Sequence, residues 1–341
     1  SPNLALSMEF TKWLALDTGA ALDYRMSMEY ANVDRNDDVL SHNGLDGRSV
    51  WEASVFAQLR FSLGPLVPEV PLSLRLGGRY TRNELFEDDF SVRATLLYRF
   101  FEHQSLKIAY GRSFRAPTLF ELYFETAQQT VFGSQDLMPE TSQSIEVAWS
   151  GGFGNFFAQV VGYWATYDQR IFRKRDPTNS FFKYTNGSGF QAFGGELELA
   201  YRDTELFDAF LNYTVIYGND GDALESEPSH HNFKYVPNHT VSVGLGKRYR
   251  GLVVSSTVNW IHERGAPLDT LPGTITWDAT LGYRSTGWGN HYIIAKSLLD
   301  TDVRTPDYIR RNLNSHTGDP LSRRRLGGQQ LRQRLRLAQL G

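Results

Sequence analysis

What this sequence lacks narrows its fold class first. Its 341 residues include no cysteine, which excludes disulfide bonds, thiolate catalysis and cysteine-ligated zinc. No stretch approaches 18 uninterrupted apolar residues, so the sequence contains no candidate transmembrane helix. The formal net charge is −3, which argues against a nucleic-acid-binding protein, because such proteins are usually basic overall. No charged-then-apolar leader opens the chain at Ser1, and we expect either a processed protein or the C-terminal piece of a longer one.

Apolar and polar residues alternate with a period of two over most of the chain. The clearest apolar series on one parity are Ala20, Leu22, Tyr24 and Met26; Trp51, Ala53, Val55, Ala57 and Leu59; and Val92, Ala94, Leu96, Tyr98 and Phe100. These runs extend for about ten residues, whereas strands usually have about five or six. Aromatic residues stand near the run ends, at Tyr30, Phe61, Tyr80, Phe100, Trp149, Trp260 and Tyr283. Long alternation with aromatic ends is typical of strands that cross a membrane in a β-barrel.

Short and long connections also alternate along the chain. The predicted short turns are residues 16–19, 64–69, 102–104, 151–154, 203–206, 250–251 and 285–289. The predicted long loops are residues 34–48, 114–138, 172–188, 218–236 and 264–274. A soluble sandwich has no reason to separate its loops by length, whereas outer-membrane barrels have short periplasmic turns and long extracellular loops. The sequence therefore predicts an all-β fold, an antiparallel transmembrane β-barrel wall of about fifteen strands, of which the first covers residues 4–14.

One stretch, residues 111–146, carries motifs rather than plain alternation. The motif residues are Phe114, Arg115, Ala116 and Pro117, then Glu121, Leu122 and Tyr123, then Leu137, Met138, Pro139 and Glu140. Pro117 ends the incoming strand, because proline donates no ladder hydrogen bond and biases Ala116 toward extended geometry. We expect the motifs to fix the strand end and the return of the loop, with Arg115 paired to a carboxylate. The alternative is direct contact of Phe114, Arg115 and Glu121 with a ligand or with another domain.

The motifs resemble the barrel-domain signature of TonB-dependent outer-membrane receptors, in which an sFRAPtl-ELy run is followed by an nLkPEtS run. Further similarities fall at residues 163–171, 186–199, 235–239 and 298–300. The resemblance implies a 22-stranded barrel in the outer membrane of a Gram-negative bacterium, preceded by a plug domain. It implies uptake of a scarce nutrient, most often a ferric siderophore, energised by TonB through that plug.

The same resemblance implies that this chain holds fourteen or fifteen C-terminal strands and lacks the plug and the early strands. The expected partners are outer-membrane lipid, an iron chelate or similar small ligand, and the TonB complex through the plug. Neither a nucleic acid nor a resident cofactor is expected.

Two groups of side chains are candidates for ligand contact. Aromatic residues of the long loops would either stack on a bulky chelate or pack on one another, and the sequence does not separate these two interpretations. The aromatic candidates are Phe120, Tyr123, Phe132, Phe182 and Tyr184. Four arginines of the polar parity, Arg75, Arg79, Arg93 and Arg99, would attract an anionic chelate or pair with the plug.

Three rival interpretations have less support. A passive, porin-like channel is the alternative function, although a porin would lack these motifs. No GxSxG or HExxH run is present, so no enzyme is expected. His230, His231 and His239 stand near carboxylates, but such a run is more often a solvated loop than a metal site, and no metal site is predicted. Residues 116–140 contain no histidine, which disfavours haem as the ligand.

The C-terminal residues depart from the pattern of the preceding chain. We assign residues 1–308 to the barrel and residues 309–341 to an atypical terminus. That terminus is rich in arginine and has no valine, isoleucine or aromatic residue after Ile309. Because family barrels close with a strand that ends in an aromatic residue, we expect a degraded or frame-shifted closing strand here.

Overall fold

The computed structural model of the protein describes residues 3–28, 30–33, 39–67, 70–126, 130–176, 181–203, 205–220, 236–265, 270–285, 287 and 289–299. The chain divides into two compact units. Unit 1 comprises Ser1–Leu199 with Thr214–Phe233, and unit 2 comprises Ala200–Tyr213 with Lys234–Gly341. Among the described residues no helix is long and apolar enough to cross a membrane.

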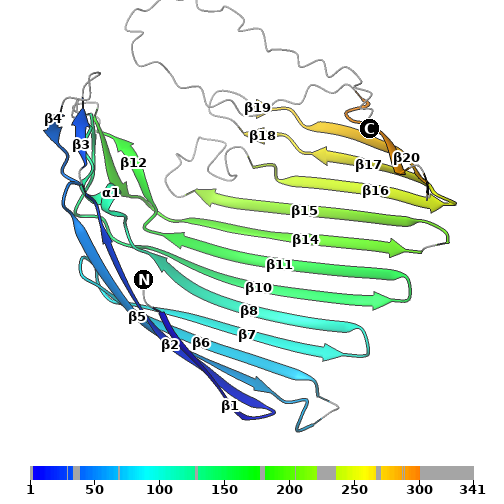
Figure 1. The fold of residues 1–341 in the computed structure, drawn as a ribbon, viewed down its shortest axis with the longest axis horizontal. Coiled ribbons are helices and arrows are strands. Elements are labelled where there is room, and N and C mark those ends of the chain that lie inside the picture. The colour runs from blue at the N-terminus through cyan, green and yellow to red at the C-terminus, as the bar shows by residue number, and fades with distance from the viewer. Residues whose placement is uncertain are drawn as a thin grey trace, which may run out of the picture. The chain divides into compact units, whose positions relative to one another are not determined.

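Fourteen long strands, counted over the described residues, form one sheet whose hydrogen-bonded neighbours follow chain order (Figure 1). They are β1 (Asn3–Thr11), β2 (Leu14–Met26), β5 (Ser49–Ser62), β6 (Leu72–Asn83), β7 (Asp89–Phe100), β8 (Gln104–Arg115), β10 (Glu140–Phe153), β11 (Phe156–Asp168), β14 (Phe190–Arg202), β15 (Asp208–Asp220), β16 (His239–Tyr249), β17 (Leu252–Ile261), β20 (Thr274–Ser285) and β21 (Gly289–Ala295). The order begins at β1 and ends at β21. The predicted all-β antiparallel wall of fourteen or fifteen strands is confirmed.

The prediction for the first strand and its turn is wrong. β1 ends at Thr11 and β2 begins at Leu14, so residues 16–19 lie inside a strand. The hydroxyl oxygen of Thr11 accepts hydrogen bonds from the backbone N–H groups of residues 13 and 14, at 3.3 and 3.1 Å, and these close the turn early. Gly19 serves close packing instead of a turn, because a Cβ there would lie 2.4 Å from the carbonyl oxygen of Leu4 and 2.7 Å from the Phe56 ring.

Most of the remaining short connections agree with the sequence prediction. The turn predicted at residues 151–154 is an exception, because β10 runs to Phe153 and β11 begins at Phe156. β7 and β8 are joined by residues 101–103, and β20 and β21 by residues 286–288. β16 and β17 are joined by Arg250 and Gly251, whose φ angles of 45° and 88° are both positive, as a two-residue type I′ hairpin turn requires. Each long strand therefore reverses within a few residues at this end.

In unit 1, one face of the sheet is apolar from strand to strand. Leu96, Ile108 and Val147 are direct neighbours across β7, β8 and β10. This face is open to its surroundings, since the exposed fraction is 43% for Val147 and 55% for Val55. Within the described residues only eight hydrophobic side chains are buried, and no large side chain is fully buried. The described part of the chain therefore has no dry core like that of a sandwich, and its apolar face requires a hydrophobic medium.

The opposite face of unit 1 carries polar side chains that bond one another. The Lys107 ammonium donates to Glu146 at 2.7 Å, and the Arg60 guanidinium donates to Asp17 at 2.9 Å. These residues take the other parity of their strands, opposite to the apolar series. Alternation between an apolar and a polar face is the pattern of a membrane barrel with a wet interior.

Aromatic rings gather near the short turns of unit 1. Three close pairs lie there, Trp13 with Phe61, Tyr98 with Phe100, and Trp149 with Phe153, with ring centroids 5.8, 5.6 and 6.2 Å apart. Rings at this level form the interfacial girdle of a membrane strand, because one side of the ring is apolar and the other tolerates water.

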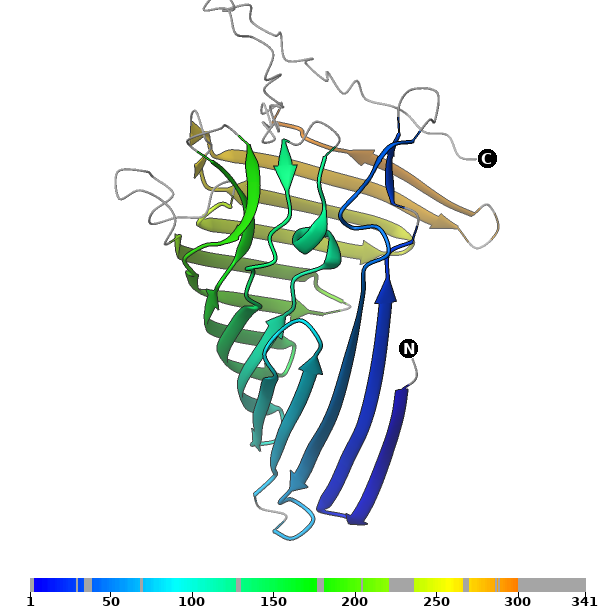
Figure 2. The ribbon, with the colours of Figure 1, turned by 90° about the vertical axis from the view of Figure 1, so that its left-hand side faces the viewer.

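The long-loop end of unit 1 carries small elements beyond the long strands (Figure 2). They are α1 (Leu119–Tyr123), a sheet of β12 (Ile171–Arg175), β13 (Phe182–Asn186) and β9 (Val131–Phe132), and a hairpin of β3 (Ala31–Val33) with β4 (Val39–His42). Unit 2 has one small pair, β18 (Arg264–Gly265) with β19 (Thr270–Leu271). The candidate site is built from the elements of unit 1.

Candidate functional site

The motif stretch begins where β8 ends. β8 runs to Arg115, and the buried Pro117 follows two residues later, as the sequence predicts. Phe114 lies directly opposite Thr141, and Arg115 lies opposite Glu140, the first residue of β10. The long loop therefore leaves and returns at adjacent positions of two paired strands.

A short helix, α1, starts directly after the proline. The hydroxyl of Thr118 accepts from the Glu121 N–H at 3.2 Å, and the Glu121 carboxylate accepts from the Thr118 N–H at 2.8 Å. This reciprocal pair is a capping box, which satisfies two N–H groups that the first helical turn leaves unpaired. α1 was not among the predicted elements, although Thr-x-x-Glu after a proline is a sequence signal for the start of a helix.

Arg115 binds two carboxylates at once. Its Nε donates to Glu140 at 2.5 Å, and its two Nη atoms donate to the two oxygens of Glu121 at 3.0 and 3.2 Å. The pairing of Arg115 with a carboxylate is confirmed. A planar guanidinium suits such forked contacts better than an ammonium group does. The fork joins the end of β8, the start of β10 and the first turn of α1.

Glu140 extends this network to a third segment. Its second oxygen accepts a hydrogen bond from the backbone N–H of Ile171 at 2.6 Å. Glu140 is the first of the fourteen residues of β10 and lies at the long-loop end. Because a tilted strand needs only about nine to eleven residues to cross a bilayer, Glu140 lies outside the membrane-spanning part of β10. Burial raises the pKa of Glu140, but hydrogen bonds from Arg115 and from the Ile171 N–H outweigh it, so the net pKa is lowered. The Glu140 and Glu121 carboxylates raise the pKa of Arg115, with Glu140 contributing most. Arg115 and Glu140 are therefore both charged at neutral pH.

A side-chain amide holds the return of the loop. Asn186 Oδ1 accepts from the Met138 N–H at 2.7 Å, and its Nδ2 donates to the carbonyl oxygens of Met138 and Gln169, at 2.9 and 2.7 Å. Beneath this clamp the buried Leu137 packs with Leu122 and Ile171. These contacts give the motif residues Leu122 and Leu137 a structural role, and they leave Pro139 between two fixed neighbours.

The aromatic candidates divide into two groups. Phe120 stacks on Phe124 with ring centroids 4.0 Å apart, and its edge meets Tyr184 at 6.3 Å. Tyr123 and Tyr184 both pack against the buried leucine cluster, and the Arg48 guanidinium lies 4.4 Å from the centre of the Tyr123 ring. The structure therefore brings Phe120, Tyr123 and Tyr184 together around α1.

The second aromatic group lies on the small sheet. The rings of Phe132 and Phe181 are 5.8 Å apart, and Phe182 pairs with Val131 along the parallel β13–β9 contact. Phe120 and Phe181 are exposed at 38% and 37%. The contacts show loop self-packing, and ligand contact by these five candidates stays a prediction.

A contact that our sequence analysis did not predict ties a second loop to α1. The buried amide of Asn43 accepts from the Glu125 N–H at 3.1 Å and donates to the Glu125 carbonyl oxygen. Beside it, the edge of Tyr30 meets Phe124 at 6.2 Å. Asn43 and Glu125 are 82 residues apart, and no local pattern in the sequence links them.

The family model described as TonB dependent receptor-like, beta-barrel matches residues 2–299. The chain belongs to this family. Family members are outer-membrane receptors and transporters rather than enzymes. Residues 309–341 lie beyond the match and outside the described residues, so their assignment as a degraded closing strand stays a prediction.

Individual family members are distant in sequence. The vitamin B12 transporter BtuB of Vibrio vulnificus is 22% identical over 298 residues, which are 83% of this chain and 42% of BtuB. The ferric enterobactin receptor PfeA of Pseudomonas aeruginosa has a TM-score of 0.65 at 16% identity, covering 88% of this chain and 48% of PfeA. The siderophore receptor PirA of Acinetobacter baumannii has a TM-score of 0.64 at 12% identity over 89% of this chain. This chain spans less than half of BtuB and of PfeA, and the structural likeness shows the fold alone.

Of the three histidines considered for a metal site, only His239 lies among the described residues. His230 and His231 lie outside the described residues. In unit 2, the ring nitrogen of His239 is 2.8 Å from the Tyr213 hydroxyl, and its ring meets His262 edge-on. In the part of the chain that the structure describes, no three histidine, aspartate or glutamate side chains group as metal ligands.

Proposed function

We propose that this chain forms the wall and the loop platform of an outer-membrane receptor that takes up a ferric siderophore. One observation carries the proposal: the motif residues fix an aromatic platform to the long-loop end of a wall with one apolar face. The Arg115 fork and the Asn43 and Asn186 clamps immobilise the loop backbone, so a ligand would meet prearranged rings. TonB, acting through a plug domain, is the proposed source of energy.

The apolar face supports the outer-membrane location. It presents exposed Leu, Val, Ile and aromatic side chains over successive strands of unit 1, and the aromatic pairs stand at the level of the short turns. Water would penalise such a surface, whereas lipid hydrocarbon would cover it at no cost. Short turns then face the periplasm and the platform faces the exterior.

Charge on the polar face favours an anionic ligand. Arg75 lies directly opposite Arg60. Arg93 lies opposite Gly77, which is two residues along β6 from both Arg75 and Arg79. Among the described residues no carboxylate contacts Arg75 or Arg93. Like charges on adjacent strands repel each other, and a bound anion would relieve that repulsion. A ferric tris-catecholate carries several negative charges, whereas cobalamin carries much less negative charge. PfeA has been solved with enterobactin bound, which is a precedent within this fold.

Titration of the purified chain in detergent with an iron(III) tris-catecholate, followed by tryptophan fluorescence, tests this proposal. We expect saturable binding that the double substitution Arg75→Gln and Arg93→Gln weakens by about fivefold to tenfold at low salt, with less effect at high salt. The Arg→Lys double variant keeps both charges and should bind nearly as the parent does.

Other outcomes separate the parts of the proposal. Saturable binding of cobalamin without binding of the iron complex would retain a receptor and reject the ligand class. Binding of neither compound, together with a steady open-pore current in a planar bilayer, would instead identify a passive channel.

A further inference from the structure

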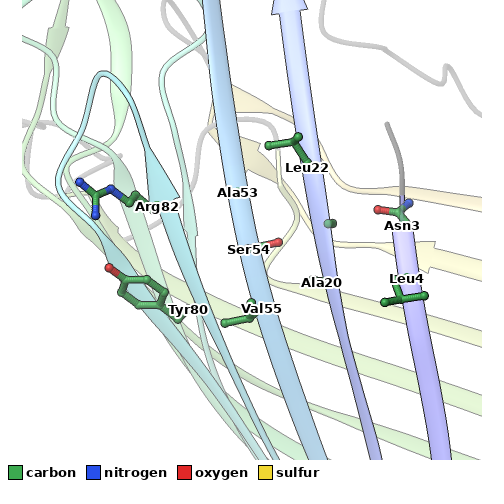
Figure 3. A pocket seen from close by; sticks show the side chains of 10 residues that line it. Asn3, Leu4, Ala20, Leu22, Ala53, Ser54, Val55, Tyr80 and Arg82 are labelled. Atoms are coloured by element: carbon green, nitrogen blue, oxygen red, sulfur yellow. The ribbon is translucent and has the colours of Figure 1, made fainter.

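A shallow cavity of about 600 Å³ lies on the apolar face of unit 1, away from the loop platform (Figure 3). Its lining comes from the neighbouring strands β1, β2, β5 and β6. In the cross-strand register Ala20 stands between Leu4 and Val55, and Ala53 is the direct neighbour of Leu22. The two alanines are small, so the surface dips between larger apolar neighbours.

One end of this cavity carries a cation. Arg82 is the direct neighbour of Ala53 and takes the parity of the apolar face. Its side chain is exposed, and no described residue forms an ion pair with it. An arginine on the lipid face of a barrel is strongly unfavourable at the bilayer midplane and is tolerated near the interface. Arg82 is the penultimate residue of β6, at the long-loop end, which places it at headgroup level.

Tyr80 supports this depth assignment. It precedes Arg82 by two residues on the same face, and its hydroxyl donates to the carboxylate of Asp88. A tyrosine with an apolar ring in the cavity lining and a bonded hydroxyl at the loop end is typical of the membrane interface. The cavity therefore runs from headgroup level at Arg82 into the hydrocarbon zone at Val55.

We propose that this cavity binds an anionic, phosphate-bearing lipid of the outer membrane, with an acyl chain along Ala20, Ala53 and Val55 and the phosphate on the Arg82 guanidinium. The inference rests on the proposed membrane location. Hydrocarbon is the occupant that an apolar groove accepts, and the planar fork of arginine matches phosphate oxygens. A free phosphate would bind the Arg82 guanidinium without occupying the groove.

Native mass spectrometry of the purified chain, released from micelles doped with phosphatidylglycerol or with phosphatidylcholine of the same acyl chains, tests the site. We expect one retained phosphatidylglycerol in several-fold excess over phosphatidylcholine. Arg82→Gln should abolish that preference, and Arg82→Lys should keep part of it. Ala53→Phe fills the groove and should lower the retention of both lipids. Arg25→Gln makes the same charge change on the polar face of β2, where Arg25 pairs with Glu52, and should leave retention unchanged.

Each remaining outcome has a defined meaning. Equal retention of the two lipids, or equal loss in Arg82→Gln and Arg25→Gln, would overturn the lipid site while the membrane location stands. Retention of inorganic phosphate alone, without lipid, would also overturn it. Failure of the chain to associate with micelles or vesicles at all would reject the membrane location itself. Circular dichroism of each variant verifies that the strands remain folded.

Discussion

At the scale of single residues, the site depends on side chains that each satisfy several partners. Arg115 reaches two carboxylates, and Glu140 accepts from both Arg115 and the Ile171 N–H. Isolated surface ion pairs contribute about 0–1 kcal/mol, but removal of one member here leaves the others half-paired at a partly buried position. Loss of a shared acceptor should therefore exceed the cost of an ordinary surface pair.

We predict that Glu140→Gln lowers the free energy of unfolding by about 1–2 kcal/mol at neutral pH. The pKa of Glu140 is lowered in the folded protein, so its contribution is present above the unfolded pKa and is lost as pH falls through the folded pKa. The difference between parent and variant should consequently shrink in acid. Urea titrations in detergent at neutral and acidic pH measure it. Glu87→Gln, at an exposed loop carboxylate, serves as the control, and an equal effect of the two variants would contradict the prediction.

At the scale of elements, α1 is a helix too short to persist alone, because helix nucleation is unfavourable. Five residues hold their helical geometry through the capping box, the Arg115 fork and the packing of Leu122. Gly133 contributes as well, since a Cβ there would lie 2.5 Å from the backbone of Leu122. The helix thus forms because its surroundings specify it.

We predict that Thr118→Ala destabilises α1 by about 1 kcal/mol, the usual cost of an N-cap hydroxyl. Hydrogen exchange should become faster at the amides of Glu121 and Leu122, with little change in β8 and β10. Thr118→Ser keeps the hydroxyl and should restore protection. Unchanged exchange in the alanine variant would show that the Arg115 fork alone holds the helix.

At the scale of the whole molecule, stability depends on the medium around each face. Val147 and its neighbours face outward on one parity, and Glu146 bonds Lys107 on the other. A charged side chain should therefore destabilise the protein at one position of a strand and be tolerated at the next. Ile108 and Ala109 of β8 give a direct comparison, because they differ by one residue and by one face.

We predict that Ile108→Lys costs about 2–4 kcal/mol of insertion free energy, as expected for a cation near the bilayer midplane. Ala109→Lys places the same group directly opposite Glu146 on the polar face, and should cost less than about 1 kcal/mol. Folding into vesicles along a urea series measures both values. Equal costs would mean that the two faces do not meet different media.

The local chemistry of the sequence was enough to determine the strands, most of the short turns and the ends of the motif loop. Alternation sets which side chains share a face, and Pro117 stops β8, through effects that act within a few residues. The first turn escaped prediction because Gly19 is needed for the Leu4 carbonyl and the Phe56 ring, a requirement that appears only when three strands pack. The hydrogen bond between Asn43 and Glu125 joins segments 82 residues apart, and the one between Glu140 and Ile171 joins segments 31 residues apart. Only the tertiary structure decided such contacts, because strand pairing brings distant segments together and periodicity carries no information about their separation.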